Sequence, residues 1–463
     1  REASVMVRPV ILWSDSLIFL LVLGILAMFR FVKTSPQTRA NWRQVFSTKI
    51  GCSTFMVMSL YVLIALLDSL HFQKSLPTTS ADEKVYFSSE VLSVLDWIHE
   101  DMRVNQEKTY SAPFALYSFS KENMRNASGQ LYRDHPRLLH GGTHLVDAND
   151  RWLDIVKLSF VAFSKGSFFA LAIILITAQV LRRASIETYL PTGTIYTVIF
   201  VTSAVYAWVL ELGAVYHIMG TDKVGADVLY QSIKSIRTGV LIGAFATLLS
   251  LPFAIGLGIS AGYFKGYIDD LVQYIYTTLS SIPDILLIAA AVLVIDVYIE
   301  NHAQDFSLLF SRADFKFLAL CAIFGLTSWT GLCRLLRAET LKVSQLNYVN
   351  AARAFGVSHL GIITRHILPN VMHLVIISLV LNFSVFVMAE AVLAYIGVGV
   401  DSSINSWGNM INSARQELSR DPAVWWSISA AFIFMFSLVL SANLFSAQVR
   451  AAFAPRTHDS RAP

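Results

Sequence analysis

A polar stretch between two long apolar segments reads NYVNAARAFGVSHLGIITRHILPN over residues 347–370. Four of its residues recur at the helical spacing i, i+4, i+7 and i+11: Tyr348, Ala352, Phe355 and His359. This spacing predicts a short amphipathic helix with one compact face of small residues. Gly356 is expected to break the helix after two turns, and Pro369 marks where the next helix can begin. A short helix held between two apolar spans has a shape that another protein can bind.

The stretch resembles the ATPase-coupling loop of permease subunits of bacterial ABC importers, in which Glu-Ala-Ala-x3-Gly is followed by Leu-Pro. Its fuller pattern is similar to the dipeptide and oligopeptide branch, in the second or C-type permease. The resemblance implies that a loop over residues 334–370 couples to an ATPase through nine residues: Tyr348, Asn350, Ala351, Ala352, Arg353, Phe355, Gly356, Ser358 and Pro369. Asn350 stands where that branch usually has Glu, and an amide can hydrogen-bond but cannot form an ion pair with a cation.

The composition places the chain among polytopic membrane proteins. Of its 463 residues, 55% are hydrophobic and only 15% are charged, which differs from a soluble globular domain. The net charge of +4 would suit a nucleic-acid partner, but the basic residues gather in short loops between apolar runs. Membrane orientation therefore explains the positive charge better than nucleic-acid binding does.

Nine apolar runs are long enough to cross a bilayer core of about 30 Å, which requires about 20 residues in a helix. They lie near residues 10–32, 52–70, 158–181, 194–216, 239–261, 271–298, 317–333, 372–396 and 427–448. The predicted fold class is therefore an all-α polytopic membrane protein. The family resemblance implies a type I ABC importer permease core of about six helices, with extra N-terminal and inserted helices.

Four groups of basic residues fix the predicted orientation. They are Lys33, Arg39, Arg43 and Lys49; Arg182 and Arg183; Arg334, Arg337, Lys342, Arg353 and Arg365; and Arg450, Arg456 and Arg461. All four groups fall on one side of the membrane if the nine spans are real, and the positive-inside rule makes that side cytoplasmic. The amino terminus is then outside and the carboxyl terminus inside.

The resemblance covers about residues 34–70 and 218–456, so the chain divides into six predicted parts. These are an N-terminal span with a cytoplasmic lead (1–51), a first core span (52–70), an extracytoplasmic inserted domain (71–157), an inserted helix hairpin (158–217), the permease core (218–456) and a cytoplasmic tail (457–463). Nine aromatic residues between positions 86 and 152 predict a small folded domain with its own core. Its role as a structural cap or as a dock for a binding protein stays open.

Two further motifs resemble extracytoplasmic segments of the same family. Residues 220–229 read GTDKVGADVL, and residues 406–410 read SWGNM. They supply four candidates for an outer gate or for contact with a binding protein: Asp222, Asp227, Trp407 and Asn409. Asp and Gly are also ordinary turn residues, so a purely structural elbow before the fifth span is the alternative for the first motif.

Three residues at span depth are candidates for the translocation path. Pro283 is expected to bend the sixth span, which lipid tolerates only where neighbouring helices or a cavity satisfy the freed backbone group. Asp284 and Glu390 are acids within apolar spans, where a charge is costly unless it faces the bundle interior. Each acid could instead form hydrogen bonds that hold two helices together.

The chain contains no Gly-Lys pair and therefore no P-loop of its own. It is predicted to be a transporter subunit and not an enzyme, with no metal or cofactor of its own. The resemblance implies a bacterial inner-membrane location and four kinds of partner: a second permease, two ATPase subunits that use ATP and Mg, a substrate-binding protein and the lipid bilayer. Nucleic acid is not among them.

Two other classes of function remain open at this point. An ion-coupled secondary transporter would show inverted repeats and facing broken helices, and no internal repeat is evident. A membrane-embedded hydrolase would need a nucleophile and a base at span depth, which Asp284 and Glu390 do not supply. Within the importer class, a peptide is the expected cargo of this branch, and a nickel complex is the alternative.

Overall fold

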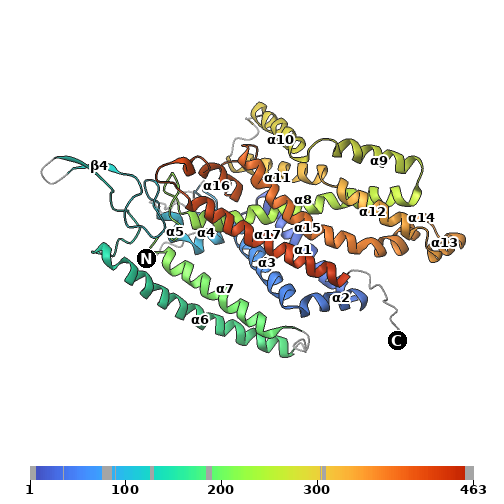
Figure 1. Ribbon diagram of the computed structural model, residues 1–463, viewed down its shortest axis with the longest axis horizontal. Helices are drawn as coiled ribbons and strands as arrows, with labels where there is room; N and C mark the ends of the chain where they lie inside the picture. The colour runs from blue at the N-terminus through green and yellow to red at the C-terminus, as the bar shows by residue number, and fades with distance from the viewer. Residues whose placement is uncertain are drawn as a thin grey trace.

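The computed structural model describes residues 7–34, 36–75, 86–88, 90–125, 130–183, 190–302, 304 and 309–453. Its helices run roughly side by side along one long axis (Figure 1). The predicted tail, 457–463, lies outside the described residues. The two ends of the long axis carry different structures, and this polarity places the candidate sites.

Each of the nine predicted spans corresponds to a helix or to a pair of helices. The single helices are α1 (Trp13–Thr34), α3 (Lys49–Asp68), α6 (Arg151–Arg183), α7 (Thr192–Gly213), α8 (Val228–Phe264) and α17 (Trp426–Phe453). The composite ones join α9 (Tyr267–Ser280) to α10 (Asp284–Asn301), α11 (Leu309–Thr327) to α12 (Thr330–Val343), and α14 (His359–Ile362) to α15 (Leu368–Tyr395). Within the described ranges, seven helices are long and apolar enough to cross a membrane, or eight with the bent α9–α10 pair.

The sixth predicted span is broken. The sequence predicts a bend at Pro283, and α9 and α10 meet there at an angle of 83°. A proline lacks the N–H for the helical hydrogen bond, and its ring clashes with the preceding turn. Helix α9 therefore ends at Ser280, and α10 starts immediately after Pro283. Residues 271–298 therefore do not form one continuous helix.

The fifth span is longer than predicted, because α8 begins at Val228 and not near residue 239. Asp227 caps it, and its Oδ1 accepts a hydrogen bond from the Tyr230 N–H at 2.9 Å. At 1.5 Å per residue, its 37 residues make a rod of about 55 Å, longer than a bilayer core. Hydropathy misses the first turns because Lys234 and Arg237 lie in them.

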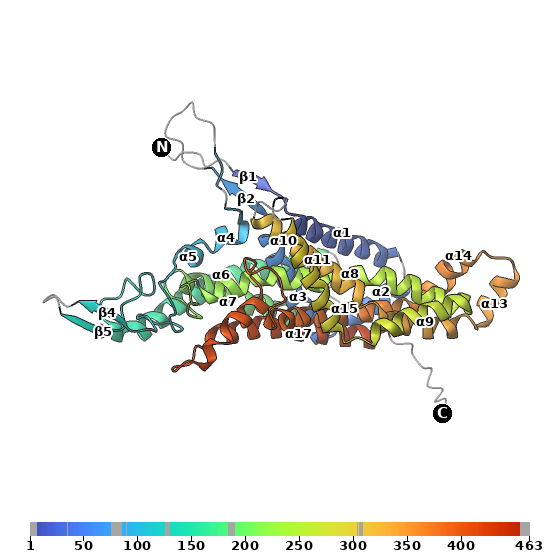
Figure 2. The same cartoon turned by 90° about the horizontal axis from the view of Figure 1, so that it is seen from above.

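The amino terminus lies on the same side as the inserted segment 71–157. Strand β1 (Val7–Val10) pairs antiparallel with β2 (His71–Lys74), which pairs in turn with β3 (Leu92–Ser93). Figure 2 shows β1 and β2 beside each other, away from α13 (Asn347–Ala354). This pairing agrees with the predicted outside position of the amino terminus.

The inserted segment does not build its core from its own aromatic residues. Of the nine on which the prediction rested, only Tyr110 is buried, and Tyr86, Trp97 and Trp152 are largely exposed. Its elements are short: α4 (Val94–Ile98), α5 (Glu100–Val104) and the hairpin of β4 (Glu122–Arg125) and β5 (Leu131–Asp134). Apolar residues of the segment pack instead against the outer ends of α6, α7 and α8: Leu95, Met102 and Leu116 join Leu212, Tyr216 and Leu229 in one cluster.

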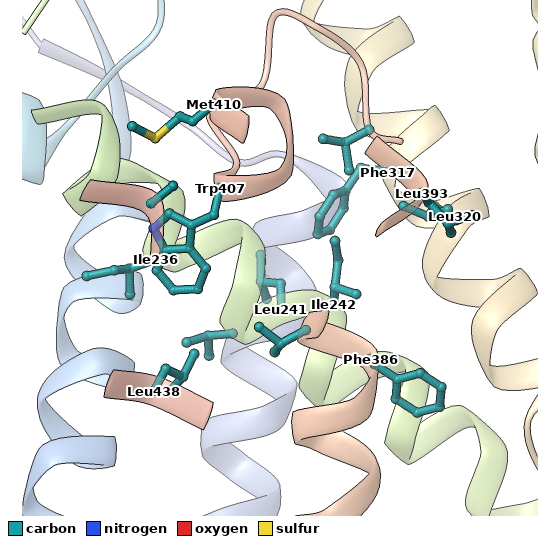
Figure 3. Packing of buried hydrophobic residues seen from close by; sticks show 14 of the residues in the cluster. Ile236, Leu241, Ile242, Phe317, Leu320, Phe386, Leu393, Trp407, Met410 and Leu438 are labelled. Carbon is teal, nitrogen blue, oxygen red and sulfur yellow. The ribbon is translucent and has the colours of Figure 1, made fainter. Parts of the chain in front are cut away.

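The main apolar cluster joins side chains of α8, α11, α15 and α17 (Figure 3). A short helix, α16 (Trp407–Ala414), folds back over α8 and places the fully buried Trp407 beside Ile236. The Trp407 Nε1–H donates to the carbonyl oxygen of Ser232 at 3.0 Å. This contact fixes α16 on the side of α8.

Two cations of α8 are held by acids from distant segments. Lys234 Nζ lies 3.6 Å from Asp68 Oδ1 and also contacts Asp96 of α4. Arg237 Nη2 lies 2.7 Å from Asp15 Oδ1 of α1, and the other oxygen of Asp15 lies 2.9 Å from His71 Nδ1. The four carboxyl and imidazole partners are almost fully buried, so these pairs tie α1, β2 and α4 to α8.

A third buried cluster joins the inserted segment to the turn before α8. His217 Nδ1 lies 2.9 Å from Asp227 Oδ2, and His217 Nε2 lies 3.6 Å from Glu107 Oε1. Burial alone would lower the pKa of His217, but the hydrogen bonds and charges of the two carboxylates raise it to about 9. Burial alone would raise the pKa of Glu107, but His217 and the backbone N–H groups of residues 139–141 lower it to about 2.

The His217 cluster predicts a loss of stability at alkaline pH. Because the folded pKa of about 9 lies above the unfolded value of 6.5, the pairing stabilises fully below pH 6.5, by about 3 kcal/mol, and is lost as pH rises through 9. We expect the thermal midpoint of the detergent-solubilised protein to fall between pH 6.5 and 9.5. H217Q should lack most of this fall, whereas H140Q, at an exposed position, should keep it. An equal fall in the wild type and in H217Q would contradict the assignment.

Candidate functional site

The polar stretch 347–370 forms one tip of the molecule. Figures 1 and 2 both place α13 and α14 at one end of the long axis, and β4 at the opposite end. Since β4 belongs to the outer segment with the amino terminus, the tip lies at the end predicted to be cytoplasmic. Helix α2 (Pro36–Ser47), which carries Arg39 and Arg43, lies toward this end as well.

Helix α13 ends as the sequence predicts. Gly356 has a φ of +75°, and its N–H donates to the Arg353 carbonyl at 3.1 Å. The Val357 N–H donates to the Ala352 carbonyl, also at 3.1 Å, which completes a Schellman motif. A left-handed residue is required at this position, and glycine adopts it without the steric cost of a Cβ.

The sequence predicted that Tyr348, Ala352, Phe355 and His359 share one face of a single helix. That face ends at the Gly356 turn, so the prediction for His359 was wrong. Ser358 caps a new helix, with its Oγ 3.2 Å from the Gly361 N–H, so His359 begins α14 and does not continue α13. Pro369 does mark the start of the next helix, because α15 begins at Leu368. Helix α14 runs through a π-helical turn, Ile363–Ile367, into α15, and Pro369 lies in the first turn of α15. The wide π turn accommodates a residue that lacks an N–H.

One buried side chain anchors α13. Val349 is 0% exposed and packs in an apolar cluster with Tyr263 of α8, Val343 of α12 and Ile362 of α14. Ala352 lies partly buried against the same cluster. The outward side is apolar and exposed, with Phe355 at 87%. We name this the coupling surface, and it consists of Leu346, Tyr348, Phe355, Val357 and Leu360.

Contacts from α8 and α15 hold the two sides of the Gly356 turn. Tyr263 lies 2.9 Å from His359 Nδ1 through its hydroxyl, and the Arg353 guanidinium lies over its ring at 5.3 Å. The Tyr348 hydroxyl accepts a hydrogen bond from Asn370 Nδ2 at 3.0 Å. Asn350 donates to the Gln345 carbonyl at 3.1 Å, so this amide makes a local bond within the tip.

The basic residues that lead into the tip are paired with α9. Arg337 holds Asp269 through two hydrogen bonds, one of them 2.7 Å from Nη2 to Oδ2. The Arg334 guanidinium lies over the ring of Tyr276 at 5.1 Å. These contacts connect α12 to α9, the first half of the broken span.

The three candidates for the translocation path lie in different environments. Pro283 and Asp284 are exposed at the break between α9 and α10. Glu390 is only 3% exposed and lies against Ser406 and Gly408, such that a Cβ added to Gly408 would lie 2.7 Å from its Oε1. The position of Glu390 suits a tie between α15 and α16, whereas Asp284 is open to a partner or to a path.

The four candidates for an outer gate or for contact with a binding protein also lie in different environments. Asp227 and Trp407 are buried, the first as the cap of α8 and the second beneath α16. Asp222 and Asn409 line a pocket of about 260 Å³ between the turn, α8 and α16. Within the described residues, no three His, Cys, Asp or Glu side chains are grouped so that they could hold a metal ion.

Several residues of the site were not predicted. Val349, Tyr263 and Asp269 are ordinary helix residues in the sequence, and only the packing of distant helices gives them a role. Lys234 and Arg237 did carry a signal, since two cations one turn apart beside an apolar run need buried acids as partners.

Residues 254–459 match the family model described as binding-protein-dependent transport system inner membrane component. This region of the chain carries the domain of that family. The protein is a multi-pass inner-membrane permease subunit of an ABC importer. The match begins within α8 and includes α9 to α17, so it contains the broken span and the whole coupling tip.

Relatives support this assignment. The glutathione transport system permease protein GsiD of Pectobacterium atrosepticum is 28% identical over 240 residues, which are 52% of this chain and 73% of the relative. The dipeptide transport system permease protein DppC of Alkalihalophilus pseudofirmus is 28% identical, covering 52% and 72%. The di/tripeptide transport system permease protein DppC of Pseudomonas aeruginosa is 29% identical, covering 53% and 75%.

The anchoring of α13 predicts how it can be released. A carboxylate at position 349 would be buried without a partner, so V349D should detach α13 from the apolar cluster around Tyr263. We expect limited proteolysis of inside-out vesicles to cut near residues 344–358 at least tenfold faster than in the wild type. V357D, at a partly exposed position, is the control and should be cut at the wild-type rate. Equal rates in the two variants would show that Val349 does not anchor the helix.

Proposed function

We propose that the chain forms, together with a second permease subunit, the membrane path of an ATP-driven importer of short peptides. Two ATPase subunits would use ATP and Mg at the cytoplasmic tip, and a substrate-binding protein would deliver cargo at the outer end. The cargo class rests on the names of relatives, which are permeases for glutathione, dipeptides and di/tripeptides.

The single observation that supports coupling is the form of the tip. Helix α13 has one fully buried side chain, Val349, while Phe355 and the rest of the coupling surface stay exposed. A contiguous apolar patch at the end of a helix is typical of a protein interface. Nine residues are proposed to act in coupling: Tyr348, Asn350, Ala351, Ala352, Arg353, Phe355, Gly356, Ser358 and Pro369.

The proposed mechanism depends on a partner that binds one state of the tip better than the other. A ligand shifts a conformational equilibrium only by its differential affinity for the two states. If ATPase closure pulls on the coupling surface, the motion passes to α8 through Tyr263 and to α15 through Asn370. The exposed break at Pro283 and Asp284 is proposed to face the path, while Glu390 keeps α15 and α16 together.

The domain division is proposed in a modified form. The core at 218–456 carries the path, with 52–70 as its first span. The parts at 1–51, 71–157 and 158–217 are proposed to be additions that pack on this core. Asp15 pairs with Arg237, Asp96 pairs with Lys234, and His217 pairs with Asp227. The four outer candidates Asp222, Asp227, Trp407 and Asn409 are proposed to shape the outer end of the path.

A substitution at Gly356 tests the coupling role. A side chain there meets no neighbour within 4 Å, so G356V disturbs only the left-handed backbone and changes the direction of the tip. We expect the complex to assemble in the membrane but to lose at least 90% of the ATP hydrolysis that is stimulated by transport. G397V is the matched control, because Gly397 has a φ of +85°, equally open surroundings and a place at the opposite end of α15. Normal stimulation in G356V would defeat the proposal.

A second substitution separates docking from folding. F355A removes the most exposed side chain of the coupling surface and leaves Val349 in its cluster. We expect the ATPase subunits to dissociate at least fivefold more readily in detergent pull-downs, because a large aromatic side chain at an interface contributes much of its affinity. L335A, an exposed apolar position on α12 away from α13, should retain them. Equal retention in both variants would place the ATPase contact elsewhere.

A further inference from the structure

The pocket of about 260 Å³ at the outer end has walls from three regions of the chain. Tyr110 comes from the inserted segment, Asp222 and Lys223 from the turn before α8, and Asn409 and Ser413 from α16. Three of these five residues precede residue 254, where the match to the family model begins. The pocket therefore combines the permease core with parts of the chain outside that match.

The walls are held together by hydrogen bonds. The Thr221 hydroxyl donates to the Thr109 carbonyl at 2.9 Å and accepts from the Ser111 N–H at 2.7 Å. The Thr221 carbonyl accepts from Trp426 Nε1 at 2.8 Å. The inserted segment, the turn and α17 are thus fixed around Thr221, so the pocket is formed before any ligand arrives, as small-molecule sites usually are.

Some of the polar side chains that line the pocket have an oxygen atom that can accept a hydrogen bond from a ligand. Both hydrogen-bonded contacts of Asn409 Nδ2, to the carbonyls of Asp401 and Ile404, are 3.0 Å long, which leaves its Oδ1 to accept. Gln231 donates through Nε2 to Asp222 at 2.8 Å, which leaves its Oε1 to accept. An ammonium group carries three donors and suits such a set of oxygens.

The walls carry charges of both signs. Asp222 and Glu417 supply two carboxylates, and Glu417 also contacts Arg420. Lys223 lies exposed on the lining, where its ammonium can meet a carboxylate from solution. A volume near the lower end of the usual range of about 300–1,000 Å³ suits a molecule of one to a few residues. Opposite charges in one small polar pocket match a zwitterion.

We propose that this pocket binds a small zwitterionic amino compound, such as a free amino acid or a dipeptide, within this single permease subunit. Its ammonium group lies among the oxygens of Gln231, Asn409 and Asp222, and its carboxylate lies at Lys223. Tyr110 closes one side, so the inserted segment takes part in the choice of ligand. The proposal rests on the proposed function only for the class of cargo, and the site is separate from the coupling surface.

The test uses the complete importer in lipid nanodiscs without its binding protein, and radiolabelled dialanine as the probe. We expect saturable binding of dialanine and at least tenfold weaker competition by N-acetyl-dialanine and by dialanine amide, each of which lacks one charge. S413W fills the mouth of the pocket and should remove the binding. S419W is the control, because Ser419 is exposed nearby without lining the pocket, and it should bind as the wild type does. Y110F and K223Q should each weaken binding at least threefold.

The outcomes separate this proposal from the proposed function. Absence of saturable binding, equal competition by the blocked peptides, or unchanged binding in S413W would overturn the pocket. The same nanodiscs are then assayed for ATP hydrolysis stimulated by the loaded binding protein. Normal stimulation without dialanine binding would leave the importer function in place and refute the pocket alone, whereas binding that S413W removes, in an importer without stimulation, would support the pocket and refute the importer function.

Discussion

Two partly buried cations in the first turns of α8 are paired with buried acids, and the structure at that end of the bundle depends on these pairs. Lys234 and Arg237 lie one turn apart on the helix, and their partners Asp96 and Asp15 come from two segments far away in sequence. Removing one member of a buried ion pair leaves a charge without compensation, at a cost of about 3–5 kcal/mol. The N-terminal helix and the inserted segment are consequently integral parts of the bundle and not loose appendages.

The tip that α13 and α14 form is held in a different way. Val349 anchors α13 in an apolar cluster, Tyr348 and Arg353 contact Asn370 and Tyr263, and several large apolar residues around them face solvent. The opposite end of the bundle is fixed instead by three charge clusters. Helix α8 joins the two ends, since Asp227 caps it at the outer end and Tyr263 touches His359 at the inner end.

Between the two ends, the broken span α9–α10 has few buried residues. Its break at Pro283 is exposed, and Arg337 fixes α9 to α12 just below the tip. This arrangement connects the tip to the sharply bent α9–α10 pair.

The sequence by itself determined the membrane class, the approximate positions of the long apolar helices, the bend at Pro283 and the end of α13 at Gly356, because these depend on local chemistry. An apolar run, a missing N–H and a left-handed residue act within a few residues of themselves. Only the tertiary structure decided that His359 starts a new helix, that Glu390 lies against Ser406 and Gly408, and that the inserted segment shares its core with α6, α7 and α8. Those outcomes depend on which distant groups meet. The free energy of a buried charge or side chain is set by its neighbours in space, which the order of residues along the chain does not specify.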